Sequence, residues 1–150
     1  METLHARANT FINRPVSQAF EFLCDPRTDP TELTPLEEHV TERSETFGVG
    51  FMCRVTIEMA ARELSCKTRC IELEPPRRLV TRLEGDLEAT QTWELAPEEE
   101  GTRAELNLEI IAPKWLPAYL RDETTASRWS QMLADQTLAK LKASLEEPQL

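Results

Sequence analysis

The sequence predicts an α+β fold in which a curved antiparallel sheet of six to seven strands wraps around one long C-terminal helix. Between residues 36 and 111, apolar side chains recur at every second position in successive short runs, which is the pattern of half-buried strands. A short helical pattern comes before these runs, and a long one follows over residues 119–145. A chain of 150 residues can bury a sizeable core and suits one domain over residues 1–150.

The N-terminal part of the chain predicts a strand, a short helix and a loop. Residues 3–12 are β-compatible, and Asn13 and Pro15 are residue types that cap a helix or open its first turn. Apolar residues then recur at helical spacing: Val16, Ala19, Phe20 and Leu23. Asp25-Pro26 ends this helix, and the proline-rich segment up to residue 35 predicts a loop.

Six strands are expected in succession after this loop. Residues 36–47 are charged and weakly patterned, as in a strand at a sheet edge. The clearest alternation, in residues 51–59, follows the turn Gly48-Val49-Gly50. The other strands are expected at residues 64–73, 79–83, 87–95 and 103–111. Their short spacing favours an antiparallel meander.

The C-terminal helix is expected to contact more than one element. Residues 119–145 contain no glycine and no interior proline. Two apolar stripes run along them, one with Trp129, Met132 and Leu133 beside Gln136, the other with Ala134, Leu138, Leu141 and Leu145. The simplest arrangement lays this helix across the concave face of the sheet, with a pocket between the two.

Composition and charge exclude several classes of function. The chain has 27 acidic and 17 basic side chains, a net charge of −10. This balance argues against binding to nucleic acid, which needs clustered lysine and arginine, and against anionic membranes. The sequence has neither a secretory leader pattern nor eighteen consecutive apolar residues, so membrane insertion is not expected. The four cysteines are then expected to be reduced thiols in a cytoplasmic protein.

The alternating strand faces, if they point inward, line a space under the helix. The apolar members of this predicted lining are Phe51, Val55, Ile57, Leu64, Trp93, Leu106, Leu108 and Ile110, with Trp129, Met132 and Leu133 of the helix. These residues fit a filled core equally well. The polar residues Thr68, Thr81 and Gln91 alternate in step with apolar residues of their own strands, so they are expected on the same inward face. Because buried polar groups need partners, these three either orient a carbonyl or hydroxyl of a ligand or bond to neighbouring backbone.

Candidate catalytic groups are scarce. The four best-patterned strands have no Asp, Glu or His on the inward face, and His39 lies on the edge-like strand, where a solvated position is expected; His5 is the other histidine. Asp122 and Glu123 suit the first turn of the last helix, where they complement the helix dipole. No catalytic residue is therefore assigned.

The cysteines and arginines give no clear site either. Cys66 and Cys70 lie about 13 Å apart along one strand, too far to share a tetrahedral ion. Cys53 is expected near Cys66 across a hairpin as a small buried thiol. No metal and no cofactor are expected. Four arginines near the Pro-Pro turn could bind an acidic headgroup or a carrier protein, or form a solvated charge cluster: Arg69, Arg77, Arg78 and Arg82.

Three segments carry a resemblance to a known family. Residues 11–25 contain a strand that runs into a proline-led helix ending in Asp, residues 72–79 read Glu-Leu-Glu-Pro-Pro-Arg-Arg-Leu, and Trp93-Glu94-Leu95 is followed by Gly101-Thr102. These segments resemble the opening, the Glu-x-Pro-x-Arg connector and the late hairpin of the SRPBCC superfamily. This helix-grip group includes START lipid-transfer domains, birch-pollen-type allergens and polyketide cyclase-like proteins. The family tryptophan after the first helix is missing from residues 28–36.

The resemblance implies a hydrophobic cavity under the long helix. The leading hypothesis is non-catalytic binding or carriage of a small hydrophobic molecule, such as a lipid or a polyketide. The alternative is a polyketide cyclase- or dehydratase-like enzyme, which predicts a titratable group in the cavity. A third class is a protein-interaction module like the chaperone activators of this fold, which predicts an exposed apolar patch. Assembly as a homodimer is compatible with each of these.

Overall fold

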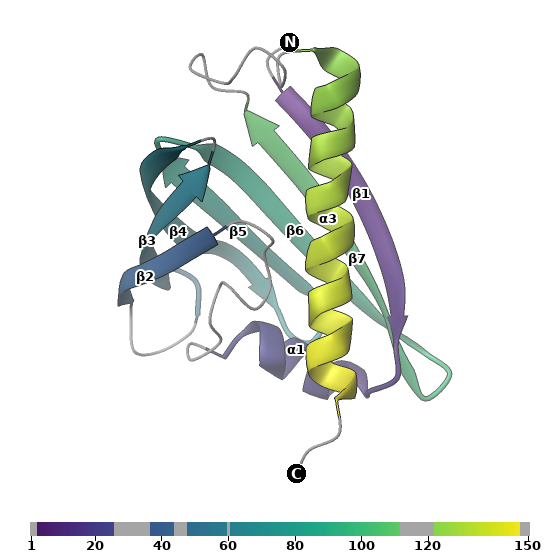
Figure 1. The fold of residues 1–150 in the computed structure, drawn as a ribbon. Helices are drawn as coiled ribbons and strands as arrows, with labels where there is room; N and C mark the ends of the chain where they lie inside the picture. Colours follow the sequence, from purple (N-terminus) through teal and green to yellow (C-terminus); the bar gives the residue numbers. More distant parts are fainter. Residues whose placement is uncertain (1–2, 26–36, 44–47, 60, 112–121, 148–150) are drawn as a thin grey trace.

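The computed structural model describes residues 3–25, 37–43, 48–59, 61–111 and 122–147 (Figure 1). The strand β1 spans Thr3–Ile12 and the helix α1 spans Val16–Leu23, as the sequence predicts. The predicted loop up to residue 35, the segment that lacks the family tryptophan and the predicted start of the last helix at residues 119–121 lie outside the described residues.

The predicted cap of α1 is wrong. The capping position is Pro15, and no side chain accepts a hydrogen bond from the first turn. Asn13 lies two residues earlier, and its backbone N–H donates to Glu146 Oε2 over 2.8 Å. A contact with the far end of the chain therefore takes the place of the local cap.

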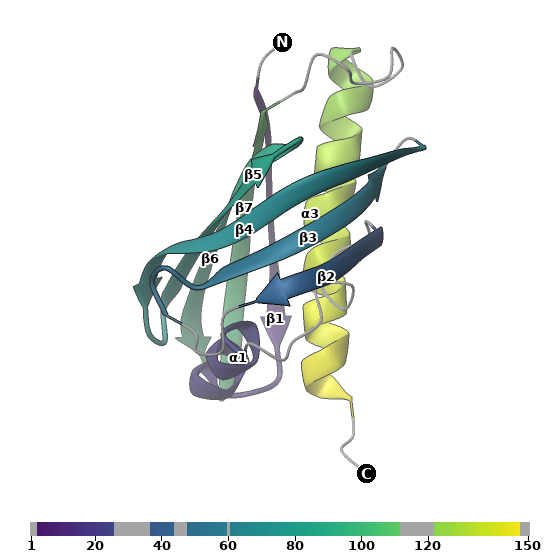
Figure 2. The same ribbon diagram turned by 90° about the vertical axis from the view of Figure 1, so that its left-hand side faces the viewer.

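Seven strands form one antiparallel sheet in the order β1-β7-β6-β5-β4-β3-β2 (Figures 1 and 2). After β1, the strands are β2 Glu37–Arg43, β3 Met52–Met59, β4 Arg62–Glu74, β5 Arg78–Gly85, β6 Glu88–Glu98 and β7 Gly101–Ile111. The strands β2 to β7 form the predicted meander, with β2 at the edge, and β1 pairs with β7. The first and last of the described strands are thus neighbours.

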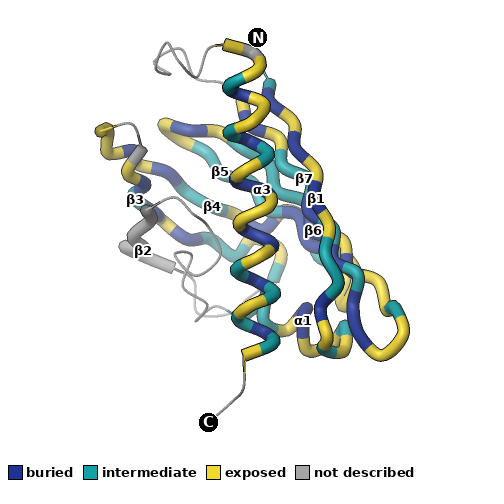
Figure 3. Tube along the Cα trace, turned by 45° about the vertical axis from the view of Figure 1, so that its right-hand side comes forward, coloured by how far each residue is buried: buried dark blue, intermediate teal, exposed yellow. Residues whose placement is uncertain are grey.

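The long helix α3, Glu123–Glu146, runs along the β1 side of the sheet (Figures 1 and 3). It packs mainly against β1 and less against β7. Small residues permit this close approach, because Ala6 and Ala8 of β1 and Ala134 of α3 are buried in one cluster. The helix therefore lies over the concave face, as the sequence predicts, closest to β1 and with side chains that reach the buried residues of β3 and β4.

Side chains of α3 also bond to the outer edge of β1. Gln131 Nε2 donates to the Arg7 carbonyl oxygen over 2.9 Å, and Lys142 Nζ donates to the Phe11 carbonyl oxygen. Lys142 pairs in turn with Glu146 at 2.9 Å. An edge strand leaves part of its backbone without a strand partner, and these side chains provide donors for two of the β1 carbonyl groups.

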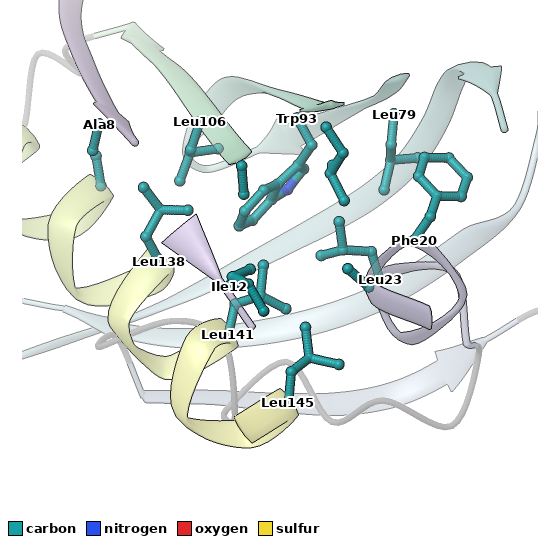
Figure 4. Packing of buried hydrophobic residues seen from close by; sticks show 14 of the residues in the cluster. Ala8, Ile12, Phe20, Leu23, Leu79, Trp93, Leu106, Leu138, Leu141 and Leu145 are labelled. Atoms are coloured by element: carbon teal, nitrogen blue, oxygen red, sulfur yellow. The ribbon is translucent and has the colours of Figure 1, made fainter. Parts of the chain in front are cut away.

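Two clusters of buried apolar side chains hold the helices on the sheet. The first lies near α1 and contains Ile12, Trp93, Leu106 and Leu141 (Figure 4). The second joins β3 and β4 to α3 and contains Val55, Ile57, Leu64 and Leu133. Together they place most of the core on the concave face.

Only one of the two predicted stripes of α3 is buried as a whole. Its residues are Ala134, Leu138, Leu141 and Leu145. In the other stripe Leu133 is buried, Trp129 is half-buried, and Met132 and Gln136 are exposed. The reason is that α3 meets the sheet along one side, so the second stripe lies at the margin of the contact.

Candidate functional site

The predicted lining residues of the strands share the concave face of the sheet. Trp93 lies opposite Leu79 and Leu106 in the register, and all three belong to the cluster that contacts α3. Gln91, two residues before Trp93, lies opposite Thr81. Directly opposed residues of an antiparallel pair point to the same face. The polar residues Thr81 and Gln91 therefore face the same side as the core.

The predicted residues differ in how much surface they keep exposed. Those that are buried in the two clusters are Val55, Ile57, Leu64, Trp93, Leu106, Ile110 and Leu133. Those that are half-buried are Phe51, Thr68, Thr81, Gln91, Leu108 and Trp129. Met132 is 38% exposed and belongs to neither cluster. The half-buried set is the part of the face that a ligand can reach.

Two further half-buried residues lie in the middle of this face. Leu83 is opposite Thr68 on one side and Ala89 on the other. We call the combined set the inner band: Phe51, Thr68, Thr81, Leu83, Ala89, Gln91, Leu108 and Trp129. The lining predicted from the sequence omits Leu83 and Ala89. Parity alone could have added both, since Ala89 alternates with Gln91 and Leu83 alternates with Thr81.

The polar members of the inner band have few protein partners. Trp93 Nε1 donates a hydrogen bond to Gln91 Oε1 over 2.9 Å. The side chains of Thr68 and Thr81 make no hydrogen bond within the part of the chain that the structure describes. The alternative in which each polar residue bonds to neighbouring backbone is therefore absent here. Their hydroxyl groups remain available to water or to a ligand.

Most charged side chains of β1 and β3–β7 lie on the convex face. Each arginine of the predicted cluster has a carboxylate partner there: Arg69 and Arg82 pair with Glu84, Arg77 with Glu74, and Arg78 with Glu72 and Glu94. The cluster is thus a solvated network of ion pairs, one of the two interpretations that the sequence allows. The described inward positions of β1 and β3–β7 are uncharged except for Arg62, which is exposed beside the turn between β3 and β4.

The cysteines are free thiols in shielded positions. Cys53 lies opposite Thr68, and Val55 lies opposite Cys66, so the expected pairing of Cys53 with Cys66 is displaced by two residues. Burial, with a smaller effect of the nearby Cys70, raises the pKa of Cys24 to about 12. Among the described residues, no group of three or more potential metal ligands comes together.

A separate groove of about 510 Å³ lies beside the β1 edge of the sheet. Its polar lining comes from the outward positions of three strands and from α3: His5, Arg7, Thr90, Thr92, Asn107, Glu109 and Gln131. His5 and Glu109 are exposed and lie opposite each other. Arg7 Nε donates to Asn107 Oδ1 over 2.9 Å, which ties part of the lining together. The side chain of His39 lies outside the described residues.

The sequence and the fold both resemble known proteins. A family model described as polyketide cyclase/dehydrase and lipid transport matches residues 3–146. No curated protein matches the sequence at a significant level. Within the described residues, no helix combines the length and hydrophobicity needed to cross a membrane.

Solved structures show the same helix-grip arrangement. Protein TTHA0849 from Thermus thermophilus superposes with a TM-score of 0.73 at 21% identity, over 94% of this chain and 96% of its own. The di-domain ARO/CYC StfQ from the steffimycin biosynthetic pathway superposes with a TM-score of 0.72 at 17% identity, over 97% of this chain and 51% of its own. Ara h 8.0201 superposes with a TM-score of 0.63 at 10% identity, over 95% of this chain and 97% of its own. These likenesses confirm the predicted fold.

Proposed function

The chain belongs to the polyketide cyclase/dehydrase and lipid-transport family, and from this premise we propose that it binds a small, largely apolar molecule at the inner band. One observation carries the proposal: the middle of the concave face is uncharged and keeps accessible surface, although the residues around it are buried. A face that only packed a core would bury Leu83, Ala89 and Leu108 as completely as Trp93 and Leu106.

The chemistry of the inner band suits a ligand that is mainly hydrocarbon. Burial of apolar surface yields about 25 cal/mol per Å², before the costs of association. Uncharged walls add no penalty for removing ions from water. The three polar side chains supply a few directional contacts, which is the usual composition of a small-molecule site.

Binding or carriage is favoured over a cyclase or dehydratase reaction. General acid–base catalysis needs a titratable group within hydrogen-bond reach of the substrate. The described inward positions of β1 and β3–β7 carry no Asp, Glu or His, and the carboxylates of these strands lie on the convex face. A small hydrophobic molecule is accordingly the proposed partner.

A protein-docking function has less support in the described residues. The large apolar side chains that they expose come from a turn and from the three separate elements β4, β7 and α3: Val49, Ile71, Ile111 and Met132. We expect the protein to work in the cytoplasm, in keeping with its free thiols.

The test uses the neutral fluorescent probe N-phenyl-1-naphthylamine and a matched pair of variants. Ala89→Phe fills the inner band, whereas Thr90→Phe places the same ring on the opposite face of β6. A loss of about 55 Å² of apolar contact weakens binding about tenfold. We expect that loss for Ala89→Phe and little change for Thr90→Phe. Absence of probe binding to the wild type, or equal effects of the two variants, would contradict the proposal. Native mass spectrometry of the purified protein then seeks the natural ligand.

A further inference from the structure

The carboxamide of Gln91 has a defined orientation. Trp93 Nε1 lies 2.9 Å from Gln91 Oε1. An indole N–H can only donate a hydrogen bond, so the atom that faces it must be the carboxamide oxygen and not the nitrogen. The Trp93 side chain is packed in the first cluster and is 2% exposed, which keeps its N–H in place. Gln91 Nε2 therefore points away from Trp93.

Gln91 Nε2 is also without a protein partner. The bond to Trp93 is the one side-chain hydrogen bond of Gln91 within the described part of the chain. Among the described residues, no fully buried side-chain nitrogen or oxygen lacks a partner. Gln91 Nε2 is consequently accessible rather than sealed in the core. Its cross-strand neighbours Thr81 and Leu108 are half-buried as well.

We infer that Gln91 selects the ligand of the inner band by donating a hydrogen bond, so that the ligand is an apolar molecule with a carbonyl oxygen. The inference rests on the proposed function and adds a chemical requirement to it. A hydrocarbon surface laid over Nε2 would remove its water without replacing the lost hydrogen bond, which is unfavourable. A carbonyl oxygen replaces that bond and carries no proton that needs an acceptor of its own.

Gln91 differs in this respect from the two threonines of the inner band. The hydroxyl groups of Thr68 and Thr81 can donate or accept, so they fit a carbonyl and a hydroxyl equally well. The free side of Gln91 presents the two N–H donors of Nε2, because its oxygen faces Trp93. Trp93 thus acts as a positioning residue, and Gln91 determines specificity.

The experiment compares two bicyclic probes of nearly the same shape, 1-tetralone and tetralin, which differ by one carbonyl group. Their dissociation constants are measured with the wild type, Gln91→Met and Gln91→Glu. Gln91→Met removes the donor. Gln91→Glu keeps an acceptor for Trp93 Nε1 and places an oxygen where Nε2 was. Thr92→Val, on the opposite face of β6, is the matched control.

The measured quantity is the ratio of the tetralone and tetralin dissociation constants, because this ratio cancels changes that affect both probes. We expect it to rise about 3- to 10-fold in Gln91→Met, by at least as much in Gln91→Glu, and not in Thr92→Val. In the wild type, the NMR signals of the Gln91 side-chain NH₂ should shift with tetralone and hardly at all with tetralin. The wild-type measurement does not depend on whether a variant folds.

The outcomes separate this inference from the proposed function. If neither probe binds the wild type in competition with the naphthylamine probe, both are overturned. If both probes bind and the ratio is the same in every variant, or if the Gln91 NH₂ signals do not respond to tetralone, the inference alone is overturned. A selective rise of the ratio supports both.

Discussion

The backbone N–H of Asn13 donates to Glu146 Oε2 over 2.8 Å, which joins the residue after β1 to the last residue of α3. Lys142 holds the same carboxylate from the previous turn of the helix. We expect Glu146→Gln to lower the free energy of unfolding by about 1 kcal/mol, less than a fully buried charged hydrogen bond because the site is partly exposed. Urea unfolding measures this. Glu147→Gln, at the exposed next residue, is the control and should change little.

The same carboxylate gives the folded state a defined pH dependence. The hydrogen bond from Asn13, followed by that from Lys142, lowers the pKa of Glu146 below its ordinary value of 4.5. A lowered pKa means that the carboxylate stabilises the fold above the unfolded value and that this contribution is lost as the pH falls through the folded value. The stability difference between the wild type and Glu146→Gln should be constant from pH 7 to about pH 5 and shrink below 4.5. A difference that persisted unchanged at pH 3 would contradict this origin.

Replacement of side chains of α3 by alanine should be tolerated on its exposed side and not on its buried side. Leu141 is 0% exposed and packs in the first cluster, so Leu141→Ala should cost about 2–5 kcal/mol. Met132 is 38% exposed, and Met132→Ala should stay within about 0.5 kcal/mol. Thermal unfolding of the two variants measures the contrast. Equal losses would mean that the second stripe of the helix is also buried.

The N-terminus of α3 depends on one side chain. Asp122 Oδ2 accepts hydrogen bonds from the backbone N–H and the hydroxyl of Thr125, each over 3.0 Å. Asp122→Ala removes this cap and should lower the melting temperature. Asp122→Asn keeps an acceptor and should retain most of the stabilisation that the cap provides. If the alanine variant melted at the wild-type temperature, the cap would be unimportant for the fold.

The cysteines should react slowly in the folded protein. With a pKa of about 12, roughly one Cys24 side chain in ten thousand is a thiolate at pH 8, and the thiolate is the reactive form. Cys53, Cys66 and Cys70 are buried. Reaction with 5,5′-dithiobis(2-nitrobenzoate) should be about a hundred times slower in native buffer than in urea. A rapid reaction of one thiol in native buffer would show that its environment is more open than described.

The sequence predicts the strands and the face of each residue well, because alternation is a local property. The parity of Thr68, Thr81 and Gln91 placed them correctly on the concave side, and the positions of the described strands follow the predicted order. The fold class followed from this alternation and from the long C-terminal helix.

What the sequence could not supply depends on contacts between distant residues. Asn13 has the composition of a helix cap, yet its N–H is used by Glu146 at the other end of the chain. The separation of half-buried from buried inward residues, such as Leu108 from Leu106, depends on where α3 lies along the sheet. The partner of Trp93 Nε1 was likewise not assigned, although Gln91 stands two residues away on the same face.

The bonds between α3 and the β1 segment have a consequence for biosynthesis. They join residues 124, 131 and 133 positions apart in the chain. The strand β1 therefore acquires its pairing partner β7 and its helical cover only after all the strands between them in the sequence have been synthesised. Until then it is an unpaired strand, and such segments are prone to aggregate. Folding of this domain should thus be completed only once α3 has been synthesised, with this helix as the last element required.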